Sequence, residues 1–292
     1  MKILVCSDGH AQAENAIRFV APIAQACGAE VTLLGIVEHP SDEPRLQESL
    51  RKQEQAFRDR NVPVELTTKS GAPTDEIRKR TQEHHYDFVA IGAERKDSGP
   101  FAMSAKAYRV IKEIEPPVLV VIGQKRELRR VLICSGGKSY IDNAVKLTSE
   151  LACKAQIGVT VLHVMAEPPL IYESMIEAEE NVAKLLASPT ALGRNLRQEK
   201  EALEKAGVPA EIKLRHGLVV PEILNEAEKG DYDLIVSGST LAGGALRTYI
   251  MGDVTSQIVN RANRPVLVVR GGEAHPRGLL ARLSQFFSSA NR

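Results

Sequence analysis

The sequence has no excess of charge of either sign and no long apolar run. Its 38 basic and 37 acidic residues leave a formal net charge of +1, whereas nucleic-acid-binding proteins usually carry a clear basic excess. No apolar run approaches the ~20 residues that a membrane-spanning helix needs. Met1 leads directly into the apolar run Ile3–Cys6, so no signal peptide is expected. The sequence therefore predicts a cytoplasmic protein with no nucleic-acid partner and no membrane span.

Motifs for metal binding and for disulfide bonds are also missing. The four cysteines are Cys6, Cys27, Cys134 and Cys153. None of them forms a Cys-x-x-Cys pair, and none lies in a cysteine–histidine cluster with the spacing of a zinc site. The simplest interpretation is four reduced, buried thiols in a reducing compartment, and we expect no metal ligand set.

What the sequence does contain is an internal repeat. Three ungapped blocks carry it, at offsets of 128, 146 and 148 residues: Ile3–Gly9 with Val131–Gly137, Tyr86-Asp87 with Tyr232-Asp233, and Pro117–Val121 with Pro265–Val269. The last pair of blocks is identical letter for letter. We therefore predict two copies of one domain, at residues 1–124 and 130–272, followed by an amphipathic C-terminal tail at 276–292. Docking of this tail on the protein's own surface, or fraying, is favoured over membrane attachment.

Each copy alternates β-branched runs with segments of helical spacing. The expected strands of the first copy are Lys2–Cys6, Glu30–Val37, Val64–Lys69, Phe88–Ile91 and Val118–Ile122. Nearly continuous apolar runs are typical of parallel strands that are buried on both faces. Alternation with helices indicates βαβ units, so the predicted fold class is α/β, with two doubly wound parallel-sheet domains. The second copy has 18 more residues after its second strand, where we expect helices interrupted near Ser188-Pro189.

Taken in order, these features resemble the universal stress protein domain. The features are an opening strand followed by Asp8-Gly9, a helix carrying Asn15-Ala16, Gly92 at the end of the fourth strand, and the terminal Pro-Val-Leu-Val-Val strand. The resemblance covers nearly all of both copies and implies a tandem universal stress protein with an adenine nucleotide alpha hydrolase-like fold. It also implies that Val118–Ile122 pairs with Val266–Val269, as in the dimers of single-domain members, which would hide two apolar edges. A homodimer of the whole chain is left open.

Part of this family binds ATP, and the resemblance implies an adenine nucleotide as the ligand. The family's marks are an aspartate after the first strand and a loop Gly-x2-Gly-x9-Gly-[Ser/Thr] after the fourth. Glycines let backbone N–H groups approach phosphates, and a helix N-terminus favours an anion. In an open α/β sheet, such a ligand lies beyond the carboxyl ends of the strands.

Each copy keeps a different part of these marks. The first copy retains the aspartate, and its candidate residues are Asp8, Gly9, His10, Val37, Gly92, Ala93 and Glu94. The second copy has a glycine instead of the aspartate but gains a cationic, glycine-rich turn. Its candidates are Ser135, Gly136, Gly137, Lys138, Ser139, Val164, Gly238, Ser239, Thr240, Gly252, Asp253 and Val254. The alternative is a tight turn that merely needs glycine. We favour the second copy as the site of one nucleotide, and decay of both sites stays open.

No pairing of a nucleophile with a base emerges from the spacing of the seven histidines. The Asp231-Tyr232-Asp233 cluster is interpreted as a turn before the fourth strand rather than a metal site. The sequence therefore predicts a stress-response protein that senses a ligand or binds a partner, rather than a metabolic enzyme. Two alternatives remain: a slow ATP-hydrolysing or nucleotide-switched enzyme, and a scaffold that only dimerises.

Overall fold

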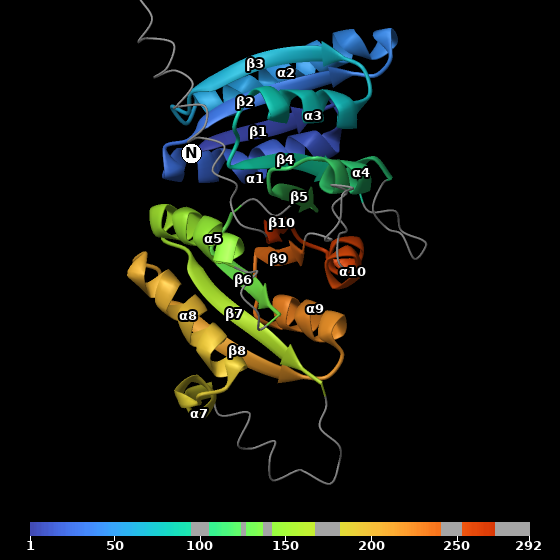
Figure 1. Ribbon diagram of the computed structural model, residues 1–292. Helices are drawn as coiled ribbons and strands as arrows, with labels where there is room; N and C mark the ends of the chain where they lie inside the picture. Colours follow the sequence, from blue (N-terminus) through green and yellow to red (C-terminus); the bar gives the residue numbers. More distant parts are fainter. Residues whose placement is uncertain (95–104, 124–126, 137–141, 167–181, 241–252, 272–292) are drawn as a thin grey trace, which may run out of the picture.

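The computed structural model describes residues 1–94, 105–123, 127–136, 142–166, 182–240 and 253–271. In Figure 1 the first copy forms the upper, blue-to-green half of the molecule, and the second copy forms the lower half. Some sequence predictions lie outside the described residues, namely the tail at 276–292 and the candidates Gly137, Lys138, Ser139 and Gly252.

The first copy alternates strands and helices as predicted. Its elements are β1 (Lys2–Ser7), α1 (Ala11–Cys27), β2 (Glu30–Val37), η1 (Pro40–Asp42), α2 (Glu43–Arg58), β3 (Val64–Ser70), α3 (Pro73–Glu83), β4 (Phe88–Ala93), α4 (Ala105–Glu113) and β5 (Val118–Ile122). Helix α1 ends at Gly28, whose left-handed conformation (φ 58°) directs its N–H to the carbonyls of the last turn. Pro73 opens α3, where the missing N–H costs no helical hydrogen bond. All five strand predictions are confirmed to within two residues of their ends.

In its described residues, the second copy repeats this order, with the α-helix α7 before α8 where the first copy has the short η1 before α2. Its elements are β6 (Arg130–Ser135), α5 (Asp142–Ala155), β7 (Gly158–Met165), α7 (Val182–Ala187), α8 (Ala191–Lys205), β8 (Ala210–His216), α9 (Val219–Lys229), β9 (Leu234–Thr240), α10 (Asp253–Arg261) and β10 (Val266–Gly271). The predicted interruption between helices is confirmed, because α7 ends before Ser188 and α8 starts after Thr190. The Thr190 hydroxyl accepts a hydrogen bond from the Gly193 N–H and so caps α8. The longer connection of the second copy therefore supplies α7, while α8 takes the place of α2.

All ten strands form one continuous sheet, in the order β3-β2-β1-β4-β5-β10-β9-β6-β7-β8. Neighbouring strands are parallel within each copy, which gives the two predicted doubly wound sheets. The copies join where β5 pairs antiparallel with β10, with Leu119 opposite Leu267. These two leucines occupy the same position of the repeat, so the pseudo-twofold axis passes between them. The predicted pairing of the two terminal strands is thus confirmed.

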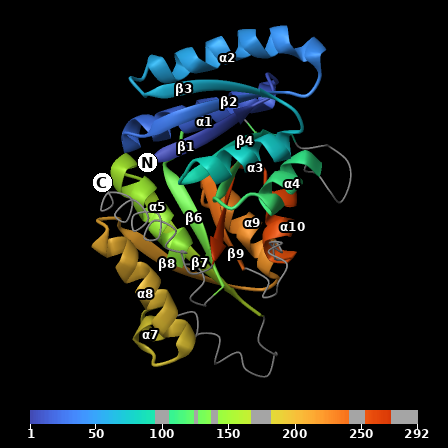
Figure 2. The ribbon, with the colours of Figure 1, turned by 45° about the horizontal axis from the view of Figure 1, so that its top comes forward.

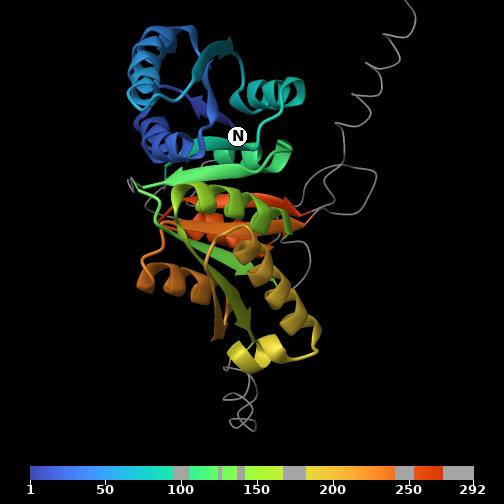
Figure 3. The ribbon, with the colours of Figure 1, turned by 90° about the vertical axis from the view of Figure 1, so that its left-hand side faces the viewer.

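Helices cover both faces of this sheet (Figures 2 and 3). The first face carries α1, α2, α5 and α8, and the second carries α3, α4, α9 and α10. Helices α1 and α5 contact each other, so the copies share a helical interface as well as the strand pair. Strand β5 is buried at every residue, and its side chains alternate between the two cores, with Leu119 in one and Val120 in the other. The core therefore continues across the junction between the copies.

The cysteines depart from the expectation of four buried thiols. Cys6 is buried, and burial raises the pKa of its thiol far above the usual value. Burial also raises the pKa of Cys134, to about 12. Cys27 and Cys134 are only partly buried and Cys153 is exposed, so the prediction of four buried thiols is confirmed for Cys6 alone. Cys27 and Cys153 lie at the ends of helices, where the helical pattern alone did not distinguish the core side from the solvent side.

The aspartate of the repeated Tyr-Asp pair binds the backbone at the start of each copy. In the first copy, Asp87 accepts a hydrogen bond of 2.7 Å from the Lys2 N–H. In the second copy, Asp233 accepts two, each of 2.9 Å, from the N–H groups of Arg129 and Arg130. Each aspartate thus ties the start of the first strand to the start of the fourth, and the turn interpretation holds. Among the described residues, no group of three or more His, Cys, Asp or Glu side chains could hold a metal ion.

Candidate functional site

The candidate residues gather at the carboxyl ends of adjacent strands. Strand β1 lies beside β4 in the first copy, and β6 lies beside β9 in the second. In each copy the chain moves outward in one direction from the first strand and in the other direction from the fourth. This reversal between neighbouring parallel strands creates the crevice in which α/β folds hold their ligands.

In the second copy, the turn after β6 starts from a fixed serine. The buried Ser135 hydroxyl donates to Glu199 Oε1 at 2.9 Å. The Ser135 carbonyl oxygen accepts from His163 Nδ1 at 2.9 Å, which places the imidazole proton on Nδ1. Burial lowers the pKa of His163 despite this bond, so the ring is neutral at pH 7. Two hydrogen bonds, one to its hydroxyl and one to its carbonyl oxygen, therefore fix Ser135 at the end of β6.

The next residue, Gly136, is not required to be glycine by any contact with the described part of the chain. It is exposed, and no described atom lies within 4 Å of the position that a Cβ would take. A glycine that packing does not require is what a close approach of backbone to a ligand would need.

On the opposite side of this crevice, the end of β9 is held by α10. The buried Thr255 hydroxyl donates to the Gly238 carbonyl oxygen at 3.0 Å and lies 2.9 Å from the Ser237 hydroxyl. Asp253 begins α10 and accepts a bond of 3.2 Å from Gln257. The sequence analysis did not single out Thr255. The available signal was its hydroxyl group, two positions after the candidate Asp253.

The remaining second-copy candidates surround the same crevice. Ser239 and Thr240 complete β9 and pair with Arg270 and Gly271 of β10. Val164 is half-buried on β7, and the side chain of Val254 is 41% exposed on the first turn of α10. The structure therefore brings together the described second-copy candidates at one edge of the sheet.

Glu199 is a functional candidate that the sequence analysis missed. It projects from α8, is only 4% exposed, and has its pKa raised to about 7. Burial is the main cause, the Ser135 hydrogen bond opposes it, and the charge of Asp142 adds to it. The signal was present in the repeat, because the first copy has Gln53 at the matching position, also buried within an apolar helical stripe.

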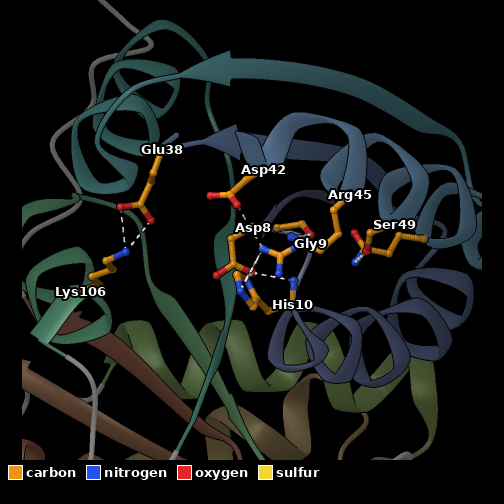
Figure 4. A network of polar contacts seen from close by, with 10 residues as sticks. Asp8, Gly9, His10, Glu38, Asp42, Arg45, Ser49 and Lys106 are labelled. Carbon is orange, nitrogen blue, oxygen red and sulfur yellow. Dashed lines mark hydrogen bonds and ion pairs between the residues drawn. The ribbon is translucent and has the colours of Figure 1, made fainter. Parts of the chain in front are cut away.

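In the first copy, polar side chains at the strand ends contact one another (Figure 4). Asp8 Oδ1 accepts from the His10 N–H at 3.0 Å, and the His10 ring lies 3.3 Å from the same oxygen. Arg45 from α2 donates to His10 Nε2 at 3.0 Å. Lys106 from α4 reaches back to Glu38, with distances of 2.5 and 2.7 Å to its two carboxylate oxygens. The family aspartate thus belongs to a closed network of its own neighbours.

The first-copy glycines, by contrast, have clear packing reasons. A Cβ on Gly92 would lie 1.9 Å from the Gln12 carbonyl oxygen in the first turn of α1. Gly9 has φ +78°, and a Cβ there would lie 3.1 Å from Leu46 Cα. Among the other candidates, Val37 and Ala93 are buried and Glu94 is exposed at the end of β4. Packing alone accounts for both glycines, without a ligand.

The second copy has small or apolar residues where the first copy has its network. By the repeat, Ala191 matches Arg45, Ala166 matches Glu38, and Val254 matches Lys106. None of the three can form the ion pairs of the first copy. The two crevices therefore share a backbone plan but differ in what occupies the space beyond the strands.

Comparison with known proteins identifies the family. The model of the universal stress protein family matches residues 1–121 and 127–270. The chain belongs to the universal stress protein family. As a tandem member with two such domains, it is 26% identical over 188 residues to a universal stress protein of Synechocystis, covering 63% of this chain and 58% of that relative. A universal stress protein of Methanocaldococcus jannaschii is 27% identical over 49% of this chain and 82% of its own.

Solved structures agree on the fold of this tandem universal stress protein. A crystal structure of a universal stress protein from Archaeoglobus fulgidus aligns with 93% of this chain and 98% of its own, with a TM-score of 0.70 at 18% identity. The alignment extends over both copies, so the paired arrangement of two domains is shared. In the part of the chain that the structure describes, no helix is long and apolar enough to cross a membrane.

Proposed function

We propose that this tandem universal stress protein is a ligand-sensing stress-response module whose second copy binds one adenine nucleotide. The phosphates would lie against the turn at Ser135 and Gly136, beside the end of β9 and the start of α10. The first copy would serve as the structural partner that completes the pseudo-dimer. Regulation would then follow from binding at a single site per chain rather than at two.

The difference between the crevices supports this proposal. In the second copy, the positions of Arg45, Glu38 and Lys106 are taken by short or apolar side chains. Gly136 is exposed, and no atom of the described residues lies within 4 Å of the position that a Cβ would take. A glycine at this position places no side chain between the backbone and an approaching anion.

Calorimetric titration with ATP tests the proposal, using nucleotide-free wild type and Gly136→Ala. The added methyl group meets no described protein atom, so it should leave the fold intact while it blocks the approach of a phosphate. We expect about one nucleotide per wild-type chain and a loss of affinity of about tenfold or more in the variant. Nucleotide released on denaturing the purified protein should be identified beforehand.

Gly158→Ala is the matched control, since Gly158 is exposed at the opposite end of the sheet and its nearest would-be contact is 3.8 Å away. It should bind ATP as wild type does. Absence of released nucleotide, together with no heat up to millimolar ATP, would overturn the proposal. Phosphate release in the same samples would instead favour the slow ATP-hydrolysing alternative.

A further inference from the structure

A cavity of about 790 Å³ lies between the two copies, and one of its lining residues, Glu199, bonds Ser135 at the end of β6. Helices α5 and α8 line most of the cavity, and residues at the start of β1 and the end of α1 line one side. Figure 2 shows α5 between α8 and the start of the chain. The volume is in the range of small-molecule sites, which are mostly apolar with a few polar groups.

The base of the cavity combines an apolar wall with one incompletely bonded acid. Val145, Cys27 and Ala202 supply apolar surface, and Glu199 also lines the cavity. Glu199 Oε1 accepts from Ser135, but Oε2 is buried and has no hydrogen-bond partner among the described residues. A buried carboxylate oxygen without a donor is costly. A ligand that donates a hydrogen bond would remove that cost.

The first copy shows that the fold does not require this arrangement. Gln53 replaces Glu199 at the matching position and donates to Ser49 at 2.9 Å. Arg60 stands where the second copy has Ala206, and its guanidinium turns back to the Ala56 carbonyl at 3.0 Å. The second copy has therefore exchanged a long cation for a methyl group and a neutral amide for an acid.

The charged groups facing the cavity favour a cation. Asp142, Lys146, Glu150 and Lys154 come from α5, Glu199 from α8, and Asp87 from the first copy, where the Met1 amino group is also near. Lys146 and Lys154 are exposed at the rim, whereas Glu199 is at the base. Once Glu199 is ionised, the innermost charge that a ligand meets is therefore negative.

We propose that this interdomain cavity binds a small amphipathic cation, an alkyl- or arylammonium ion. Its apolar body lies along α5 and α8, and its N–H groups donate to Glu199 Oε2. Binding should strengthen as Glu199 ionises, so affinity rises between pH 6 and pH 8. The site adjoins the proposed nucleotide site through the bond of Ser135 to Glu199, but it is tested on nucleotide-free protein, so either proposal can fail alone.

Three probes with the same apolar body and different heads test the proposal: 4-phenylbutylamine, 4-phenylbutanol and 4-phenylbutanoate. Calorimetry at pH 8 should show the amine binding about tenfold or more tightly than the alcohol, with the carboxylate weakest. Glu199→Gln should remove the preference for the amine, while the exposed Glu201→Gln, paired with Lys205 on the same helix, keeps it.

Ala206→Arg provides a second variant, because it introduces the side chain that the first copy carries at this position. It should abolish binding of the amine while thermal unfolding stays close to that of wild type. Equal affinity for the three probes, no binding of any up to 10 mM, or unchanged amine binding in a folded Ala206→Arg protein would each overturn the proposal.

Discussion

In both copies a helix and a strand form an ion pair beside the buried tyrosine, but the charge on the helix is reversed. The strand partners stand at different positions of the repeat, because Glu65 matches Glu211, whereas Lys213 and Arg215 match Thr67 and Lys69. In the first copy, Arg80 on α3 donates to the hydroxyl of Tyr86 at 2.8 Å and to Glu65 on β3 at 2.9 Å. In the second copy, the position of Arg80 is Glu226, which accepts from Lys213 at 3.1 Å and from Arg215 at 2.6 Å on β8. Tyr232, the counterpart of Tyr86, lies 3.4 Å from the same carboxylate.

This difference shows that neither the sign of the helix charge nor the strand position of its partner is fixed by the fold. A helix and a strand need opposite charges beside the buried tyrosine, and either direction satisfies that need. Burial alone would raise the pKa of Glu226, but the hydrogen bonds from Lys213 and Arg215 outweigh it and hold the pKa below its usual value. The copies thus both keep an ion pair at this place, whereas the residues beyond their strand ends differ in charge and size.

The largest effect should come from the glycines. Gly92→Ala places a methyl group 1.9 Å from the backbone oxygen of Gln12, which only a shift of α1 can relieve. We expect a loss of about 3 kcal/mol in the free energy of unfolding, whereas Gly136→Ala should stay within about 0.5 kcal/mol of wild type. Urea unfolding of both variants measures the difference. Equal losses would mean that Gly136 is also a packing glycine, which would remove the main structural contrast between the two crevices.

The ion pair beside the buried tyrosine should contribute more to the free energy of unfolding in the second copy than in the first. Glu226 is 3% exposed, and Glu226→Ala would leave Lys213 and Arg215 without their shared carboxylate. Because water reaches both cations, we expect a cost of about 2 kcal/mol, below that of a fully buried pair. Arg80→Ala should cost less than about 1 kcal/mol, since its partner Glu65 is 61% exposed. Chemical denaturation of the two variants measures both losses of stability. A larger loss for Arg80→Ala than for Glu226→Ala would contradict this comparison.

Glu199 should make the stability of the second copy depend on pH. In the folded protein its pKa is raised to about 7, mainly by burial, whereas an unfolded glutamate titrates near about 4.3. The folded state holds the proton more tightly, so this group lowers stability as pH rises from about 4.3 to about 7 and has no further effect above that. Glu199→Gln should therefore gain about 2 to 3 kcal/mol over wild type between pH 5 and pH 8.

Thermal unfolding of both proteins at each pH provides the measurement. Glu201→Gln serves as the control and should show no such change, because its side chain is exposed. A wild-type and Glu199→Gln difference that stays constant with pH would show that Glu199 is ionised at both values, and the contrast with Gln53 would then have no electrostatic consequence.

The fold was predictable because it depends on local patterns that occur twice. Apolar runs of β-branched residues gave every strand of the first copy, and the identical segments from Pro117 and Pro265 gave the pairing at the junction. The exposure of Cys27 and Cys153 was not predictable, because a helical pattern does not show how closely neighbouring helices pack against residues at the border of the apolar face.

The site was predictable only in its location. The resemblance named the strand ends, but the contact of Arg45 with His10 joins residues 35 positions apart, and no spacing rule encodes such a contact. Glu199 was hidden for a different reason, since a lone acid on a helix is usually solvated. Comparison of the two copies would have exposed it, because Gln53 interrupts the apolar stripe at the same place.

The smallest effect should come from the family aspartate of the first copy. Asp8 is about half exposed and closes a local turn with His10, so Asp8→Ala should cost less than about 1 kcal/mol. If the nucleotide binds only in the second copy, ATP affinity in this variant should equal that of wild type, whereas Gly136→Ala loses it. Paired calorimetric titrations separate the cases. A loss of ATP binding in Asp8→Ala would move the working site to the first copy, and it would require the network of Arg45, His10 and Asp8 to open when the nucleotide enters.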